Sequence, residues 1–306
     1  MAQFEIKDGV AIIPDGTTEI RELAFWNCTS LKSITIPESV TEIEGYAFED
    51  CTSLKSITIP NSVKAIGFGA FGGCTSLESI TIPNSVTNIG NEVFRGCTSL
   101  KSITIPESVT EICSSIFSGC TSLESIVVAD GNPVYDSREG CNAIIETTTN
   151  TLIQGCKTTV IPNSVTNIGS SAFRGCPSLE SITIPESVTD ISKAFEGCTS
   201  LKSIAIPNSV TKIDRGAFSG CTSLESVVIP KGVKKIKEYA FAGCTSLTTL
   251  TLPIGVNKIE GQVFDKCSAL AAINVPAGKA DYYKKRLPRH LHDKIVELAP
   301  EKKTKK

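Results

Sequence analysis

The chain has 306 residues, of which 41% are hydrophobic and 20% are charged, and its formal net charge is −2. This composition excludes a wholly disordered chain, and the near-neutral charge excludes strong general attraction to nucleic acid or to anionic membranes. Thirteen Cys and 12 Phe stand beside a single Met and a single Trp. Such uneven counts favour a few residue types copied many times, although the length alone would suggest two domains.

The N-terminal segment is expected to cap the molecule. The start, MAQFEIKDGVAIIPDG, has no basic residues followed by an apolar run, so no secretory leader is expected, and no stretch is long enough to span a membrane. As written, the chain is expected to be cytoplasmic. If a leader had been removed, the cell surface or the medium would be expected instead. The segment FEIKDGVAIIPDGTTEI is expected to form a degenerate first coil that covers the open end.

The sequence then repeats every 23 residues, with one step of 22. The unit reads approximately L-x-S-I-x-I-P-x-S-V-x-x-I-x-x-x-A-F-x-G-C-T-S. A fixed period of this length predicts a solenoid, in which every coil is buried by its two neighbours. Ten of the cysteines share one repeat position, which is occupied by Cys28, Cys51, Cys74, Cys97, Cys120, Cys176, Cys198, Cys221, Cys244 and Cys267.

Three segments are expected within each coil. In the second coil, residues 33–36 alternate polar and apolar side chains, which predicts a strand with one buried face that ends at Pro37. Residues 40–43 carry a second, shorter set of apolar side chains that is expected to face the core. Residues 47–51 have near-helical spacing, which predicts one turn of α- or 3₁₀-helix. The proline that ends each strand recurs so regularly that about twelve stacked coils are expected.

One island interrupts the period, because Leu123 and Leu179 are 56 residues apart rather than 46. Within the island, at about 129–158, the runs NAIIET and NTLIQG predict a β-hairpin, and GNPVYDS is turn-like. Two roles are open. The island could be a protruding binding element, or it could be an inserted hairpin that covers the core at an irregular coil. We favour the second, because most insertions carry no function.

The repeats stop near residue 278, and residues 279–299 are expected to form a C-terminal cap. A short helix is expected at 280–285, a break at Pro288 and a strand at KIVEL. Residues 300–306 are expected to be a disordered, Lys-rich tail. The net charge from 279 to the C-terminus is +6, but no aromatic stacking platform accompanies it, so we interpret the tail as solvated rather than as a nucleic-acid site.

The cysteines and histidines give no strong chemical signal. No C-x-x-C occurs, and the repeated cysteines adjoin the inward Phe, so we favour reduced core thiols over disulfides or metal ligands. Cys113 and Cys141 lie off this position and are expected to be the more accessible thiols, whereas Cys156 falls where other coils place Leu. His290 and His292 have no third ligand nearby, so surface histidines are expected.

The repeat unit resembles that of a known protein family. The unit LKSITIPESVTEIEGYAFEDC and its copies closely resemble the 23-residue leucine-rich repeats of BspA-like bacterial proteins, over about residues 10–277. The fold expected is therefore an α/β-type leucine-rich-repeat solenoid, which occupies residues 1–278 with the hairpin island inside it. The resemblance also implies adhesion or interaction with host or partner proteins, often at the cell surface.

A non-enzymatic protein-binding module is the function that we expect. No catalytic triad, phosphate loop or dinucleotide fingerprint is present, and no cofactor or metal is expected. The alternative is an intracellular scaffold or spacer, favoured by the reduced-looking cysteines. An enzyme, which would need its site in the island or the cap, is the least favoured.

Recognition is expected on the helical-turn side of the coils or in the island. The outward strand positions are uniform Ser and Thr and lack the Trp, Tyr and Arg anchors of tight interfaces. Residues around each Ala-Phe pair vary from coil to coil. The candidate partner-binding residues are Tyr46, Phe68, Arg95, Tyr135, Arg138, Arg174, Arg215 and Tyr239.

Overall fold

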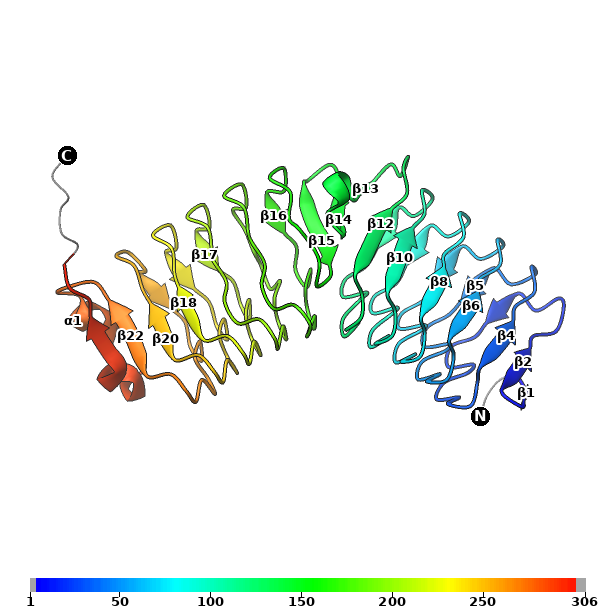
Figure 1. Cartoon of the computed structure of the whole chain (residues 1–306), viewed down its shortest axis with the longest axis horizontal. Coiled ribbons are helices and arrows are strands. Elements are labelled where there is room, and N and C mark those ends of the chain that lie inside the picture. Colours follow the sequence, from blue (N-terminus) through cyan, green and yellow to red (C-terminus); the bar gives the residue numbers. More distant parts are fainter. Residues whose placement is uncertain (1–3, 301–306) are drawn as a thin grey trace.

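Parallel strands stack coil upon coil, because the alternating S-I-T segments bury one side chain and expose two. In β6 (Ser56–Thr58), Ile57 is buried between two exposed neighbours. This strand pairs in register with β8 (Ser79–Thr81), 23 residues later. The computed structural model describes residues 4–300, and these form a curved solenoid of about 13 turns (Figure 1). The solenoid that the period predicts is therefore confirmed.

The first ladder of strands runs along one side of the stack. It comprises β2 (Val10–Ile12), β4 (Ser33–Thr35), β6, β8, β10 (Ser102–Ile105), β12 (Ser125–Val128), β18 (Ser226–Val228), β20 (Thr249–Thr251) and β22 (Ala272–Val275). At the N-terminal end, β1 (Ile6–Lys7) pairs antiparallel with β2. Between β12 and β18 the ladder is reduced to isolated bridges, such as the one that joins Thr183 to Ala205.

A second ladder is built from the inward Ile that follows each Val. It comprises β3 (Glu19–Ile20), β5 (Glu42–Ile43), β7 (Ala65–Ile66), β9 (Asn88–Ile89), β11 (Glu111–Ile112), β16 (Asn167–Ile168), β17 (Lys212–Ile213), β19 (Lys235–Ile236) and β21 (Lys258–Ile259). These two-residue strands pair in parallel with their neighbours wherever the coils are regular, as β5 does with β7.

The Ala-Phe side of each coil, which we call the turn side, is not helical. The prediction of a helical turn at 47–51 is wrong, because the residue before Ala has positive φ, as at Leu23 (61°) and Tyr46 (56°). The Phe amide instead bonds to the next coil. Phe25 N–H donates to Ala47 O at 2.7 Å, and the equivalents at Phe48, Phe71, Phe94, Phe173, Phe195, Phe218 and Phe241 do the same at 2.7–3.0 Å.

The Phe rings form two stacks in the core. Successive ring centroids lie 5.1–6.0 Å apart. The first stack ends at Phe117, and the second begins at Phe173. Buried side chains likewise form two clusters, one on each side of the island. The island is therefore the joint between an N-terminal and a C-terminal half of the solenoid.

The predicted hairpin is confirmed, and it lies inside the stack rather than protruding from it. Strands β14 (Ala143–Glu146) and β15 (Thr151–Gly155) pair antiparallel, and β15 pairs in parallel with β16. Ile144 packs in the N-terminal cluster, whereas Ala143 and Ile145 pack in the C-terminal one. The turn-like GNPVYDS contains a further short strand, β13 (Tyr135–Asp136), which pairs with β14. A 3₁₀-helix, Arg138–Gly140, follows it.

At the C-terminal end, helix α1 (Ala280–Lys284) and a 3₁₀-helix, Arg289–Lys294, precede β23 (Ile295–Glu297). The helix and the strand match the sequence expectation, and β23 adds to the first ladder beside β22. The Lys-rich tail was expected at 300–306, and its residues from 301 lie outside the described part. Within residues 4–300, no helix is long and apolar enough to cross a membrane.

Candidate functional site

Aromatic and apolar side chains are exposed on the turn side of the first three coils. Trp26 is 53% exposed, Leu23 45% and Phe68 40%, and Tyr46 is half-buried. The ring of Tyr46 packs at a tilt against that of Phe68, with centroids 5.0 Å apart. We call these four residues the N-terminal aromatic patch. Exposed aromatic and large apolar side chains that lie close together are typical of surfaces that contact other proteins.

Two of the four patch residues were among the candidates from sequence, and two were missed. Leu23 and Trp26 occupy the variable positions directly before and after the Ala24–Phe25 pair. The single Trp of the chain was therefore detectable at the position type that we had already singled out. Leu23 also has a positive φ of 61°, which is uncommon for a residue other than Gly.

The candidate arginines Arg95 and Arg174 are both paired with carboxylates, Arg95 within its own coil and with a coil two repeats back, and Arg174 with the next coil. Arg95 contacts Glu49 at 3.1 Å and Glu92 at 3.3 Å. Arg174 contacts Glu196 at 3.2 Å. Both side chains keep about half of their surface exposed, so they stay on the surface of the turn side while their charges are compensated.

Arg215 and Tyr239 form a second cluster on the turn side of the C-terminal half. The Arg215 guanidinium lies 5.5 Å from the centroid of the Tyr239 ring, and its Nε is 3.9 Å from Glu238. Such a contact favours an extended, ordered arginine. The cluster lies far along the stack from the N-terminal aromatic patch, so the eight candidates do not come together as one site.

The two island candidates hold the fold together. Tyr135 is only 7% exposed, and its hydroxyl accepts a hydrogen bond from Ile112 N–H at 3.2 Å. Burial raises the pKa of this phenol. Arg138 pairs with Asp136 at 2.7 Å and donates to Asn150 at 3.0 Å. Both side chains already make hydrogen bonds or an ion pair within the protein, so neither is free to contact a partner.

The repeated cysteines form a row of reduced thiols, all of them buried except the partly buried Cys28 and Cys267 at its ends, and all thirteen cysteines are free. Eight of the ten thiols in the row donate to a Phe carbonyl of the preceding coil, as Cys74 Sγ does to Phe48 O at 3.1 Å. Burial raises the pKa of Cys51 to about 12 and that of Cys267 to about 11. The expectation that Cys141 is accessible is wrong, because the island hairpin buries it, whereas Cys113 is half-buried.

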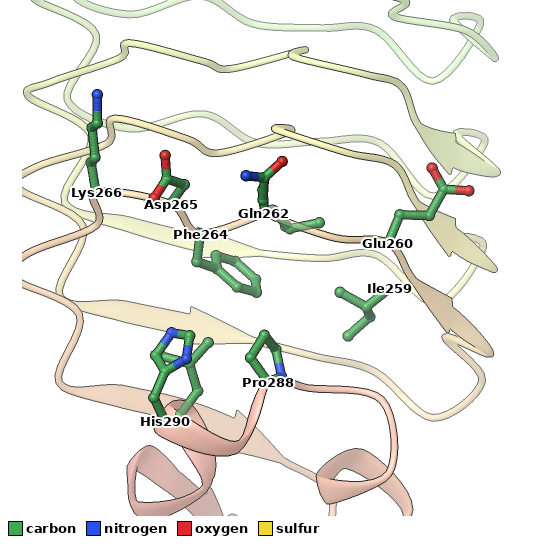
Figure 2. A pocket seen from close by; sticks show the side chains of 10 residues that line it. Ile259, Glu260, Gln262, Phe264, Asp265, Lys266, Pro288 and His290 are labelled. Carbon is green, nitrogen blue, oxygen red and sulfur yellow. The ribbon is translucent and has the colours of Figure 1, made fainter.

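A cavity of about 240 Å³ lies between the last coil and the C-terminal cap (Figure 2). Phe264, the last ring of the stack, faces Pro288 and His290 of the cap there, while Glu260 and Lys266 point away from it. His292 bonds instead to Leu287 O at 3.0 Å, so the two histidines do not converge. Among the described residues, no cluster of His, Cys, Asp and Glu is arranged to hold a metal ion.

The strand face is less uniform than the comparison of coils within this sequence suggested. Its central outward row is Thr in β4, β6, β8 and β10, but it becomes Val127, Val160 and Val228 farther along, and these three are exposed. Val160 and Val228 are separated by the rows of Thr183 and Ala205, whereas Val127 and Val160 belong to consecutive strand segments on either side of the island. Because Thr and Ala interrupt the row, the three valines do not change the ranking of the turn side over the strand face.

The sequence matches a known family over most of its length. The model of the "BspA type Leucine rich repeat region" matches residues 11–137 and 150–271, with six copies. The segment between the two matched ranges is the first part of the hairpin. No curated protein matches the chain.

Solved structures with this fold come from several bacteria. A leucine-rich cell surface protein of Faecalibacterium prausnitzii is 34% identical, with a TM-score of 0.72, and the match covers 90% of this chain and 80% of that one. A leucine-rich repeat protein of Eubacterium ventriosum is 25% identical, with a TM-score of 0.70 and coverage of 88% and 81%. The pneumococcal vaccine antigen PcpA, at 21% identity and a TM-score of 0.67, covering 89% and 84%, shares the fold.

Proposed function

Because the chain belongs to the BspA-type leucine-rich repeat family, we propose that it is a non-enzymatic module that binds a protein partner on its turn side. The observation that carries this proposal is the N-terminal aromatic patch, where Trp26 and Phe68 are exposed on nearby coils. Trp, Tyr and Arg are enriched among the few side chains that carry most of the binding free energy at tight interfaces. The arginines of the turn side would then contribute specificity.

A location at the cell surface is part of the same proposal. It is supported by the 34% identity to a protein described as a leucine-rich cell surface protein. Protease treatment of intact native cells tests it. Digestion of the protein on intact cells is the expected result, and digestion only after lysis would contradict it.

Binding measured on an array of candidate proteins tests the choice of surface. The double variant Trp26→Ala, Phe68→Ala is expected to lose a partner that the wild type binds, by at least tenfold in Kd, since each anchor at an interface centre costs about 2 kcal/mol or more. The matched control, Thr58→Ala with Thr81→Ala, lies on the strand face of nearby coils and is expected to bind normally. Loss in the control with retention in the double variant would contradict the proposal.

A structural scaffold or spacer is the second candidate function. The thirteen free thiols favour it, since reduced cysteines are typical of proteins kept in reducing compartments. Under this candidate, neither set of substitutions would affect any binding, and the native protein would fractionate with the cell interior. The two functions are therefore separated by the protease experiment and by the array together.

A further inference from the structure

Charge is divided unevenly between the two halves of the solenoid. Residues 1–128 hold 7 Lys and Arg and 15 Asp and Glu, which gives a net charge of −8. Residues 159–300 hold 17 Lys and Arg and 12 Asp and Glu, which gives a net charge of +5. The N-terminal aromatic patch therefore lies in the acidic half, whereas the cluster of Arg215 and Tyr239 lies in the basic half.

On the turn side of the basic half, the protein neutralises its own carboxylates. Asp214 lies 3.0 Å from the ammonium nitrogen of Lys212 and also pairs with Lys237. The other paired carboxylates of this surface are Asp190, Glu196, Glu238 and Glu260. Such pairs leave this surface with little uncompensated negative charge.

The carboxylates beside the N-terminal aromatic patch lack such partners. Glu22 is exposed on the first coil, and Glu44 and Asp50 are half-buried on the second. Within residues 4–300, none of the three forms an ion pair. Glu44 accepts only a backbone hydrogen bond, from Glu22 N–H at 2.7 Å. The patch is therefore flanked by negative charge that the protein does not neutralise.

Glycines of the third coil fix the positions of two of these side chains. A Cβ at Gly69 would lie 2.9 Å from Cδ1 of the Tyr46 ring, and a Cβ at Gly73 would overlap Asp50 Oδ1. The ring and the carboxylate of the second coil therefore lie over the backbone of the third. Because they are already held in place, they lose little conformational freedom when a partner binds.

An exposed aromatic ring beside a carboxylate is a favourable contact for an arginine or a lysine. The positive charge is attracted by both groups, and the methylenes of the side chain pack against apolar surface. The basic half contains such a contact, because Arg215 lies 5.5 Å from the centroid of the Tyr239 ring and 3.9 Å from Glu238. An acidic partner would instead meet like charges at the patch, which disfavours binding.

We propose that the N-terminal aromatic patch binds a basic surface of a different protein, on which Arg or Lys side chains flank apolar ones. The apolar side chains contact Trp26 and Phe68, and the basic side chains contact Glu22, Glu44 and Asp50. This inference rests on the proposed function, since it names the chemistry of the partner at the same surface.

Failure of this inference can be distinguished from failure of the proposed function. A partner from the array that needs Trp26 and Phe68 but binds equally well without the carboxylates would support the function and overturn the inference. Loss of binding in the strand-face control alone would instead contradict the function.

The test uses Trp26, the single Trp of the chain, as a fluorescent reporter at the patch. The full chain is titrated with two mixtures of backbone-cyclised decapeptides that lack Trp. Both mixtures carry a central Leu-Leu pair, which is flanked by Arg in one and by Glu in the other. We expect the Arg mixture to change Trp26 fluorescence saturably and the Glu mixture to have no effect. Salt at about 0.5 M should weaken the binding severalfold, because it screens contacts between exposed charges.

Two double variants with the same change in charge keep the outcome decisive. Glu22→Gln with Asp50→Asn is expected to weaken binding of the Arg mixture about fivefold, since two charge contacts are lost. The matched control, Glu38→Gln with Glu78→Gln, removes two exposed carboxylates of the same half outside the turn segments. It is expected to bind like the wild type. Urea unfolding of both variants verifies that they are folded.

Sedimentation of the full chain at increasing concentration tests the remaining occupant, which is the basic half of a second copy. The expected result is sedimentation that does not depend on Glu22 and Asp50. Self-association that is lost in Glu22→Gln with Asp50→Asn would overturn the assignment to a different protein. The proposal is also overturned if neither mixture changes Trp26 fluorescence, if the Glu mixture binds as well as the Arg mixture, or if the control variant weakens binding equally.

Discussion

At the residue scale, the small size of cysteine and the weak hydrogen-bond donor of its thiol explain why Cys recurs at one position of the repeat. The carbonyl of Phe48 accepts both Cys51 N–H at 3.2 Å and Cys74 Sγ–H at 3.1 Å, so the thiol links one coil to the next. The sequence could predict burial, because the position adjoins the inward Phe. It could not predict the donor role, because that bond forms between coils. Cys141 shows the same limit, since its burial depends on a hairpin that folds back over it.

The buried thiols predict a loss of stability at alkaline pH. Their pKa values are raised above the ordinary 9.0 by burial, to about 12 for Cys244 and well above 9.0 for Cys97. The folded state therefore holds protons that the unfolded state loses, and stability present below pH 9 falls as the pH rises from 9 towards 12. Urea unfolding at pH 8 and pH 10 measures this loss, which is about 1.4 kcal/mol per buried thiol.

The control for this prediction is Cys97→Ala. Between pH 8 and pH 10 it should lose about 1.4 kcal/mol less unfolding free energy than the wild type, because one rung of the thiol row is absent. An identical loss in the two proteins would show that other groups cause the alkaline effect.

Gly155 takes the place of Phe at the joint, and the lack of a side chain is essential there. A Cβ at this position would lie 2.3 Å from Cε1 of the Phe173 ring. We expect Gly155→Ala to reduce the free energy of unfolding by about 1–3 kcal/mol, because the core must shift to admit the methyl group. Gly261→Ala is the matched control, since a Cβ there meets nothing within 4 Å. Equal stabilities in urea would refute this account of the joint.

At the element scale, the hairpin was predictable but its place in the core was not. Two short strand-like runs with a Thr-rich link identify β14 and β15. That Ala143, Ile144 and Ile145 are all completely buried follows only from the two halves packing against opposite faces of β14. The strand in GNPVYDS was missed for a similar reason. Tyr135 is fixed by Asn132, whose side chain accepts its amide at 2.8 Å, and by β11 of the neighbouring coil.

Adjacent residues of β14 should stabilise different halves. Ile144→Ala and Ile145→Ala each create a cavity and are expected to cost about 2–5 kcal/mol. Native-state hydrogen exchange should then rise mainly in residues 31–128 for Ile144→Ala and mainly in residues 161–275 for Ile145→Ala. The same exchange pattern in both variants would contradict the division of the core at the hairpin.

At the scale of the whole molecule, the 23-residue repeat determines the fold. The proposed function depends instead on surface side chains that differ from coil to coil. The 23-residue spacing predicted the stack and the position of the island, because both depend on positions repeated in the sequence. The proposed binding surface depends on side chains that do not repeat, such as Trp26, and on Leu23, which is exposed at a turn with positive φ. Comparison of coils therefore predicted recognition on the turn side, and it named only Tyr46 and Phe68 of the N-terminal aromatic patch.

Hydrogen–deuterium exchange of the full chain, alone and bound to a partner found on the array, tests turn-side recognition most directly. Slower exchange is predicted at the turn segments 22–28, 45–50 and 67–72, with no change at the strands of the same coils. Slower exchange confined to β4, β6 and β8, with the turn segments unaffected, would contradict the account.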